Sequence, residues 1–267
     1  MSKAFVPLES NPQVFTALSH ALGLSPKYEF TDVFSLTDPD LLAFIPRPVH
    51  ALILVFPISP AYEQFRREAD ARAVETVDSD PASPARYSAI AGTPAQNALW
   101  YPQTIKNACG TYAILHTLAN AFPRSSEDGN DNSGDAAILP GSLADTLLRE
   151  TEGLSVEDRA KYLEASRPLY DVHHQYAAAG STDAPAADDD NIDLHFVAFT
   201  RAARGADGDH LVEYDGRRVG PIVHLESDLS GGRDILDPEH SLPYVLEYFK
   251  REKENPMFSI IALVDSE

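Results

Sequence analysis

The sequence has little cysteine, little basic charge and no long apolar run. Its 267 residues contain one cysteine, which excludes an intrachain disulfide framework and any cysteine-rich zinc site. Lys and Arg number 21 against 41 Asp and Glu, so the formal net charge is -20 and the chain repels nucleic acid and anionic membranes. The longest apolar stretch, Val49 to Ile58, is far shorter than the roughly 20 residues of a membrane-spanning helix.

These absences narrow the setting in which the protein is expected to work. The first residues, MSKAFVPLES, have no apolar signal core, so we expect a soluble protein of the cytoplasm, or also of the nucleus. We expect no metal, no cofactor, no nucleic-acid or membrane partner, and a monomer. The negative charge instead favours a cationic small molecule or a basic protein surface as the partner.

Composition and local signals predict a mixed α/β fold in one layered domain that spans residues 1–267. Capping residues, prolines and apolar spacing predict helices at Asn11–Gly23, from Asp38-Pro39 to before Pro46, from Ser59-Pro60 to about Glu68, at Asn107–Asn120, Gly141–Glu150 and Ser155–Ser166, and from Asp237-Pro238 to about Glu252. Strands are expected at Ala51–Phe56, Ile192–Phe199, His210–Asp215 and Phe258–Val264, the first of them buried on both faces. Residues 69–100, 123–141 and 177–191 are rich in small and polar residues and are predicted to be loops.

The lone cysteine lies in a setting that favours a reactive thiol. Asn107 is a good helix cap and would place Cys109 in the first helical turn, where unpaired N–H groups and the helix dipole stabilise an anion. Gly110 leaves the approach to the sulfur open. The alternative is a buried, inert cysteine, since free cysteine is among the most buried residue types.

A nucleophilic cysteine needs a base, and the candidate is His195. His116 is seven residues after Cys109, roughly 10 Å along the helix, and is interpreted as packing. If the strands around His195 and Asp215 form an antiparallel hairpin centred on Gly205, the two side chains face each other within about 5 Å at Cβ. A carboxylate there would orient the imidazole. The alternative for Asp215 is a plain Asp-Gly turn.

At these residues the sequence resembles the ubiquitin carboxyl-terminal hydrolase family of cysteine proteases, in its short form without a C-terminal extension. The block Gln103 to Thr111 is similar to the family's nucleophile motif, and Asp193–Phe196 and Glu213–Arg217 are similar to its histidine and aspartate segments. Further similarity runs through the N-terminal half, at Pro7–Pro12, Phe30–Phe34, Pro46–Pro48 and Phe56–Ile58. The resemblance covers nearly the whole chain.

The resemblance implies a single papain-like α/β domain with a central, mostly antiparallel sheet, helices on both sides and a knotted chain. It implies that Cys109 is the nucleophile, His195 the base and acid, Asp215 its orienter, and Gln103 a donor to the oxyanion. Segment 177–191 falls where the family has a crossover loop over the active-site cleft, which implies that small adducts and short peptides are preferred. From the residue type alone, a hydrogen bond at the start of the helix is the favoured explanation for Gln103.

The resemblance also implies that ubiquitin is the partner. Its tail carries arginines before a Gly-Gly end, and acidic Glu9 and Asp32 stand where the family meets those arginines, with apolar contacts around Pro7 and Leu8. Glu9 and Asp32 are alternatively solvated surface acids. A hydrolase that prefers a ubiquitin-like modifier and a non-catalytic ubiquitin-binding protein stay open as alternatives, although a pure binder has no need of all four site residues.

Overall fold

A computed structural model of the chain describes residues 4–79, 98–122, 136–177, 194–201, 209–224, 226–252 and 257–266. The helices in these ranges are α1 (Pro12–Leu22), α2 (Pro39–Ala43), α3 (Pro60–Ser79), α4 (Cys109–Asn120), α5 (Leu143–Glu152), α6 (Val156–Ala165), α7 (Arg167–Ala177) and α8 (Leu242–Arg251). The strands are β1 (Tyr28–Asp32), β2 (Val49–Pro57), β3 (Leu194–Arg201), β4 (Leu211–Tyr214), β5 (Ile222–His224) and β6 (Ser259–Asp265). None of the described helices is long and apolar enough to cross a membrane.

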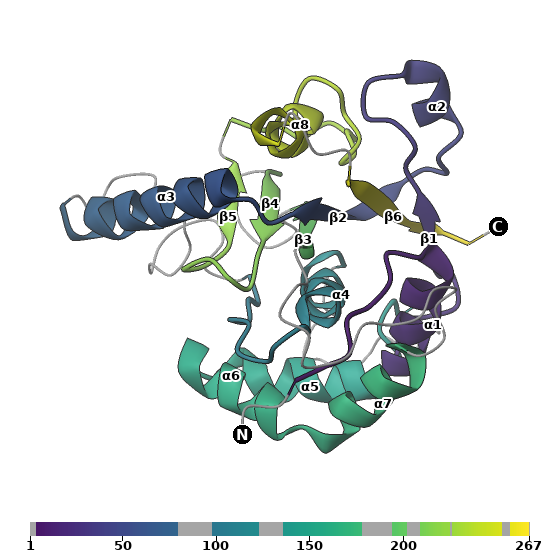
Figure 1. The fold of residues 1–267 in the computed structure, drawn as a ribbon. Coiled ribbons are helices and arrows are strands. Elements are labelled where there is room, and N and C mark those ends of the chain that lie inside the picture. The colour runs from purple at the N-terminus through teal and green to yellow at the C-terminus, as the bar shows by residue number, and fades with distance from the viewer. Residues whose placement is uncertain are drawn as a thin grey trace.

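The strands form one sheet in the order β1-β6-β2-β3-β4-β5, and every pairing in it is antiparallel. Helices cover both of its faces: α2 and α8 lie on one side, and α1, α4, α5, α6 and α7 on the other (Figure 1). The predicted α/β class with a central antiparallel sheet between helices is therefore confirmed.

The central strand β2 is buried on both faces, as its continuous apolar run predicts. Successive side chains of a strand point to opposite faces. Leu52, Leu54 and Phe56 accordingly join the hydrophobic cluster on the α8 side, whereas Ile53 and Val55 join the cluster on the α4 side. Both faces need apolar residues, which explains why this strand shows no polar alternation.

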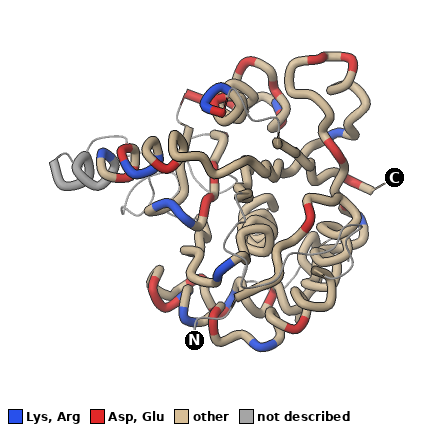
Figure 2. The backbone as a smooth tube through the Cα atoms, viewed as in Figure 1, with Lys and Arg blue, Asp and Glu red and all other residues tan. Residues whose placement is uncertain are grey.

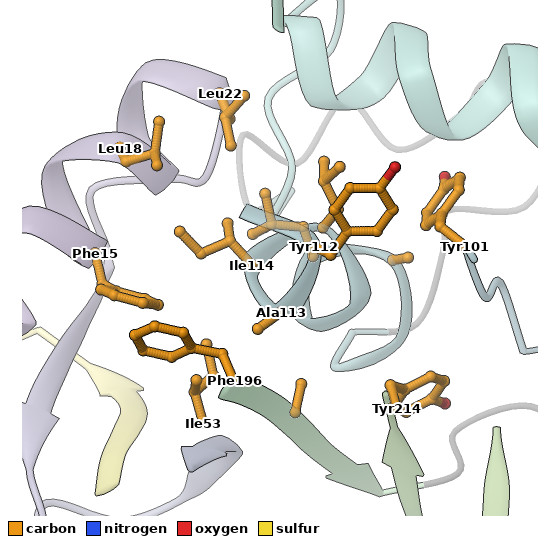
Figure 3. Packing of buried hydrophobic residues seen from close by; sticks show 14 of the residues in the cluster. Phe15, Leu18, Leu22, Ile53, Tyr101, Tyr112, Ala113, Ile114, Phe196 and Tyr214 are labelled. Carbon is orange, nitrogen blue, oxygen red and sulfur yellow. The ribbon is translucent and has the colours of Figure 1, made fainter. Parts of the chain in front are cut away.

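Helix α4 is enclosed by the protein, and every one of its residues is buried. It packs against β3. In Figure 3, Phe15 of α1, Ile53 of β2 and Phe196 of β3 lie beside this helix, and the rings of Phe15 and Phe196 are 5.4 Å apart. A helix that is apolar on all sides is stable only inside a core, and this one brings its first residue, Cys109, to a defined place in the molecule.

Local capping signals account for several helix starts. The Asn11 side chain accepts hydrogen bonds from the N–H groups of Gln13 and Val14 at the start of α1, and Asp38 caps α2 in the same way. Gly23 ends α1 with a φ of 126°, a backbone angle that residues other than glycine rarely adopt. These predicted boundaries are confirmed.

Other predicted boundaries are wrong. Helix α3 continues to Ser79 instead of ending near Glu68, because the Ala, Arg and Glu residues after Glu68 are good helix formers despite their loop-like composition. Helix α8 begins at Leu242, not at Asp237-Pro238. The Asp237 carboxylate does accept backbone hydrogen bonds, from Glu239 and His240, but these close a turn ahead of the helix.

Some elements were not predicted at all, namely β1, β5 and α7. β1 has a single buried residue, Phe30, and β5 is three residues long, so neither has a strong apolar pattern. α7 starts at Arg167 and is separated from the end of α6 only by Ser166. One of its three buried residues, His173, is polar.

The three predicted loops fall partly outside the described residues. The proposed crossover loop 177–191 does so except for Ala177, and residues 80–97 and 123–135 of the other predicted loops do so as well. The knotted chain path and the assignment of 1–267 to one domain also involve these segments, and both stay predictions.

Candidate active site

Cys109 is the first residue of α4, at the end of the helix where backbone N–H groups are unpaired. The first N–H bonded within the helix is that of Tyr112, to the carbonyl of Ala108. The cap residue is Ala108, which has no side-chain cap, whereas the predicted cap Asn107 adopts a left-handed backbone with φ 60°. The prediction for the cap is wrong by one residue, but Cys109 does lie in the first turn, where an anion is stabilised.

The segment before α1 covers the start of α4. Leu8 packs directly on Gly110: a Cβ atom added to Gly110 would lie 3.0 Å from Leu8 Cδ1. His173 of α7 bonds the hydroxyl of Thr111 through Nδ1 (2.7 Å) and donates from Nε2 to the carbonyl of Val6 (2.8 Å). Burial lowers the pKa of His173 to about 4, so the ring is neutral at physiological pH. The glycine next to the sulfur is thus a contact point, not an open approach.

The four predicted ubiquitin contacts differ in how much surface they offer. Leu8 is 6% exposed and belongs to the core cluster, so little of its side chain remains for a partner. Pro7, Glu9 and Asp32 are half-buried. Asp32 ends β1, where it pairs with Ile261.

His195 lies at the start of β3, opposite Phe56 of β2, and is 2% exposed. Its Nε2 donates to Oδ1 of Asp215 at 2.7 Å. The Cys109 side chain lies close enough to the ring to raise its pKa. Because Nε2 is bonded to Asp215, Nδ1 is the ring nitrogen left to face the sulfur. The three predicted side chains therefore form one continuous chain of contacts, and the cysteine is not buried among aliphatic groups alone.

The contact between His195 and Asp215 arises from a different register than predicted. The β3–β4 ladder pairs Ala198 with Tyr214, two positions away from the expected partner, and it ends there. A shift of two residues keeps the same side chains on the same face of a sheet. Asp215 follows directly after β4 and therefore still lies on the side of His195.

Electrostatics hold this pair in its charged form. Burial by itself lowers the pKa of His195, but the charge and hydrogen bond of Asp215, together with Cys109, raise it to about 9. Burial by itself raises the pKa of Asp215, but His195, the Arg217 N–H and the Tyr62 hydroxyl hold it well below its ordinary range. At neutral pH the site thus contains an imidazolium and a carboxylate.

Asp215 has further partners that sequence reasoning missed. Its Oδ1 accepts a second hydrogen bond from the Arg217 N–H (2.8 Å), and its Oδ2 accepts one from the Tyr62 hydroxyl (2.7 Å). The indole N–H of Trp100 donates to its backbone carbonyl at 3.0 Å. Nothing in the sequence pattern distinguishes Tyr62 or Trp100 from ordinary core aromatics.

Gln103 lies against the turn that carries Asp215. Its backbone N–H donates to the carbonyl of Gly216 at 2.8 Å, and a Cβ atom on Gly216 would come within 2.8 Å of Gln103 Cβ and 3.0 Å of its backbone nitrogen. Gly216 is therefore required for this close approach. The Gln103 amide donates one hydrogen from Nε2 to the carbonyl of Ile105 (3.3 Å), and its second hydrogen is available to another acceptor.

His116 has the packing role that its position predicts. It is buried, and its Nε2 accepts from the backbone N–H of Tyr101 at 3.0 Å, between the rings of Tyr101 and Tyr214. Burial lowers its pKa to about 3, so it is a neutral acceptor. Within the described ranges, no group of three or more His, Cys, Asp or Glu side chains is arranged to hold a metal ion.

Comparisons with known proteins agree with this arrangement. A model of the family described as "Ubiquitin carboxyl-terminal hydrolase, family 1" matches residues 5–239. The chain is 36% identical over 259 residues to a ubiquitin carboxyl-terminal hydrolase of Drosophila melanogaster, covering 97% of this chain and 96% of that one. It is 29% identical over 266 residues to ubiquitin carboxyl-terminal hydrolase YUH1 of Saccharomyces cerevisiae, covering 98% and 95% of the two chains.

Among solved structures, the fold is similar to that of the Trichinella spiralis UCH37 catalytic domain, crystallised bound to ubiquitin vinyl methyl ester. The TM-score is 0.67 at 18% identity, over 98% of this chain and 96% of that one. The match in fold, the family match over most of the length and the assembled Cys109, His195 and Asp215 lead to one assignment. The chain belongs to the family of ubiquitin carboxyl-terminal hydrolases and is a cysteine-type deubiquitinating enzyme.

Proposed function

We propose that this enzyme cleaves amide, ester or thioester bonds at the C-terminal glycine of ubiquitin, with Cys109 as nucleophile, His195 as general acid and base, Asp215 as its orienter and Gln103 as an oxyanion donor. The observation that supports these roles is the continuous chain of contacts from the Cys109 side chain through the His195 ring to Asp215 Oδ1. A nucleophile, a base and an orienting group in hydrogen-bond reach are the arrangement that covalent catalysis needs.

In the first half of the reaction, the Cys109 thiolate attacks the glycine carbonyl and a carbon–sulfur bond forms. The oxyanion accepts hydrogen bonds from the free hydrogen of Gln103 Nε2 and from the backbone N–H of Cys109. The bond to the leaving group then breaks, and the His195 imidazolium gives its proton to the departing nitrogen, oxygen or sulfur. A thioester between Cys109 and ubiquitin remains.

In the second half, water attacks the thioester. Neutral His195 takes one proton from the water, the carbon–sulfur bond breaks, and ubiquitin leaves as the carboxylic acid, which gives its remaining proton to solvent and becomes the carboxylate. The thiolate and the imidazolium are restored. Asp215 stays ionised throughout, because its pKa is held well below the working pH, and it keeps Nε2 protonated so that Nδ1 does the proton transfer.

Recognition of ubiquitin follows from charge and position. The chain's net charge of -20 complements a tail that carries arginines. Half-buried Pro7 and Glu9 in the N-terminal segment and half-buried Asp32 at the end of β1 are the proposed contacts, whereas Leu8 acts mainly through its packing on Gly110. The proposal includes segment 177–191 as a crossover loop that selects small adducts and short peptides, action as a monomer, and a location in the cytoplasm or also the nucleus.

The central test is the release of a C-terminal fluorophore from ubiquitin, compared with the same fluorophore on a ubiquitin-like protein. We expect rapid release from ubiquitin. Faster release from the ubiquitin-like protein would instead support the alternative modifier as the substrate. If the fluorophore is released from neither substrate, the result would support the alternative of a non-catalytic ubiquitin-binding protein.

The role of Cys109 is tested by Cys109→Ala. We expect turnover to vanish because the nucleophile is absent, while ubiquitin still binds, as measured by calorimetry. Wild-type protein should also be captured covalently at Cys109 by ubiquitin with a C-terminal electrophile, with the adduct located by peptide mass spectrometry. Normal turnover by the alanine variant, or an adduct at another residue, would refute the assignment.

A further inference from the structure

The Asp215 carboxylate is buried, and each of its oxygens has its own donor. The residue is 1% exposed. Oδ1 accepts from His195 and from the Arg217 N–H, and Oδ2 accepts from the Tyr62 hydroxyl at 2.7 Å. Without that hydroxyl, Oδ2 would be a buried charged oxygen with no hydrogen-bond donor among the described contacts. The carboxylate would then be held through Oδ1 alone and could tilt relative to the His195 ring.

We propose that Tyr62 is a positioning residue of the reaction: its hydroxyl holds the Asp215 carboxylate so that Oδ1 is kept on the His195 ring. This inference rests on the proposed function, because it assigns to Tyr62 an effect that passes through Asp215 and His195. Tyr62 itself does not touch the substrate or the sulfur in this scheme.

The structure holds the Tyr62 ring rigidly enough for this role. Tyr62 lies in the first turn of α3, where its backbone N–H donates to Ser59 Oγ at 3.0 Å. Its ring packs edge-on against Phe56 at 4.7 Å and lies 6.3 Å from the ring of Tyr248, and the residue is 1% exposed. Phe56 is in turn the strand partner of His195. One packed aromatic group therefore sets the position of the base and of the hydroxyl that holds its orienter.

The hydroxyl is also kept as a donor. Burial and the neighbouring Asp215 charge raise the pKa of Tyr62 well above its ordinary range, so the phenol stays protonated wherever the enzyme works. Trp100 holds the same residue from the other side of the sheet, through its bond to the Asp215 carbonyl. Tyr62 belongs to the core cluster on the α8 side and Trp100 to that on the α4 side, so Asp215 is held from both faces.

The test is Tyr62→Phe, which removes only the hydroxyl. The matched control is Tyr248→Phe: Tyr248 packs in the same aromatic group, is equally buried, and donates to a different buried carboxylate, Glu213, at 2.6 Å. We expect Tyr62→Phe to lower kcat about 10-fold with KM unchanged, because it weakens a hydrogen bond to a charged group used in chemistry and not in binding. Tyr248→Phe is expected to keep the wild-type kcat at a similar loss of thermal stability.

The second arm repeats Tyr62→Phe in an Asp215→Asn background, where the charge that Tyr62 positions is gone. We expect less than about a 2-fold further change in kcat, since residues that act as a unit are not additive. An equal loss in both backgrounds, or an equal loss in Tyr248→Phe, would overturn the inference and leave a structural role only. Wild-type and Cys109→Ala enzyme in the same assay separate this failure from a failure of the proposed function, because only the latter leaves the wild type inactive.

Discussion

At the scale of single residues, the charge of His195 is set by its neighbours. Burial opposes protonation, and the Asp215 carboxylate overcomes that cost, which places the pKa of His195 at about 9. The ring is therefore protonated below that value and loses its proton as the pH rises through it. In the proposed mechanism the protonated ring supplies the leaving group's proton. Asp215 therefore also extends the pH range over which His195 can act as the general acid.

The pH dependence of kcat/KM checks this account. We expect the basic limb of the profile to lie near 9, and Asp215→Asn to move it to lower pH, because loss of the carboxylate removes the interaction that raises the pKa of His195. The profile is measured with the ubiquitin fluorophore substrate in buffers of constant ionic strength, with Tyr248→Phe as control. A basic limb that stays in place in Asp215→Asn would contradict the pairing.

At the scale of elements, residues 98–103 join α4 to the turn that carries Asp215. On the α4 side, the Asn120 side chain accepts from the Leu99 N–H and donates to the Leu99 carbonyl, both at 2.9 Å. On the other side, Gln103 bonds to Gly216. The helix that carries the proposed nucleophile and the turn that carries its proposed orienter are thus joined through one short segment.

Asn120→Ala tests this connection. It leaves the buried N–H and C=O of Leu99 without partners, which costs about 1–3 kcal/mol for each group. We expect the free energy of unfolding to fall by about 2–6 kcal/mol, measured by urea denaturation as a lower midpoint with an unchanged slope. Asn120→Asp should be no more stable than alanine, because its buried carboxylate would face the carbonyls of Leu99 and His116, which accept from the wild-type amide. A midpoint equal to that of the wild type would show that the hydrogen bonds between Asn120 and Leu99 do not contribute to stability.

Predictability at this scale follows the strength of the local signal. Asn11 and Asp38 cap their helices through nearest neighbours, and the apolar run of β2 is long, so these elements could be predicted. The Asp237-Pro238 pair carries an equally good local signal and yet closes only a turn. Short edge strands such as β5 are stabilised mainly by pairing with β4, and that contribution is invisible along the chain.

At the scale of the whole molecule, the excess of acidic residues extends around the structure. Asp and Glu positions lie on both sides of the sheet, from the α2 and α8 side to the helices α5 and α6 (Figure 2). With a net charge of -20, the protein attracts basic partners from a distance, and attraction of this kind increases association rates more than it strengthens contacts.

A salt series measures this contribution. Raising the ionic strength from about 0.01 M to about 0.5 M shortens the screening length from roughly 30 Å to a few ångströms. We expect kcat/KM for the ubiquitin substrate to fall several-fold, while kcat at saturation stays constant because the buried His195–Asp215 pair is shielded from salt. Potassium chloride and sodium chloride should give the same curve. A kcat/KM that does not change with salt would mean that charge has no part in the encounter.

The sequence by itself determined the parts that depend on near neighbours: the start of α1, the buried strand β2, and the position of Cys109 in a first helical turn. It also pointed to His195 and Asp215 as partners, although through a register that differs from the real one by two positions. Only the tertiary structure decided how these side chains meet, that Leu8 packs on Gly110, and that Tyr62 and Trp100 hold Asp215 from opposite faces. The contacts of Leu8, Tyr62 and Trp100 join residues more than a hundred positions apart. Their geometry depends on how the helices pack on the sheet, which no local pattern of residues encodes.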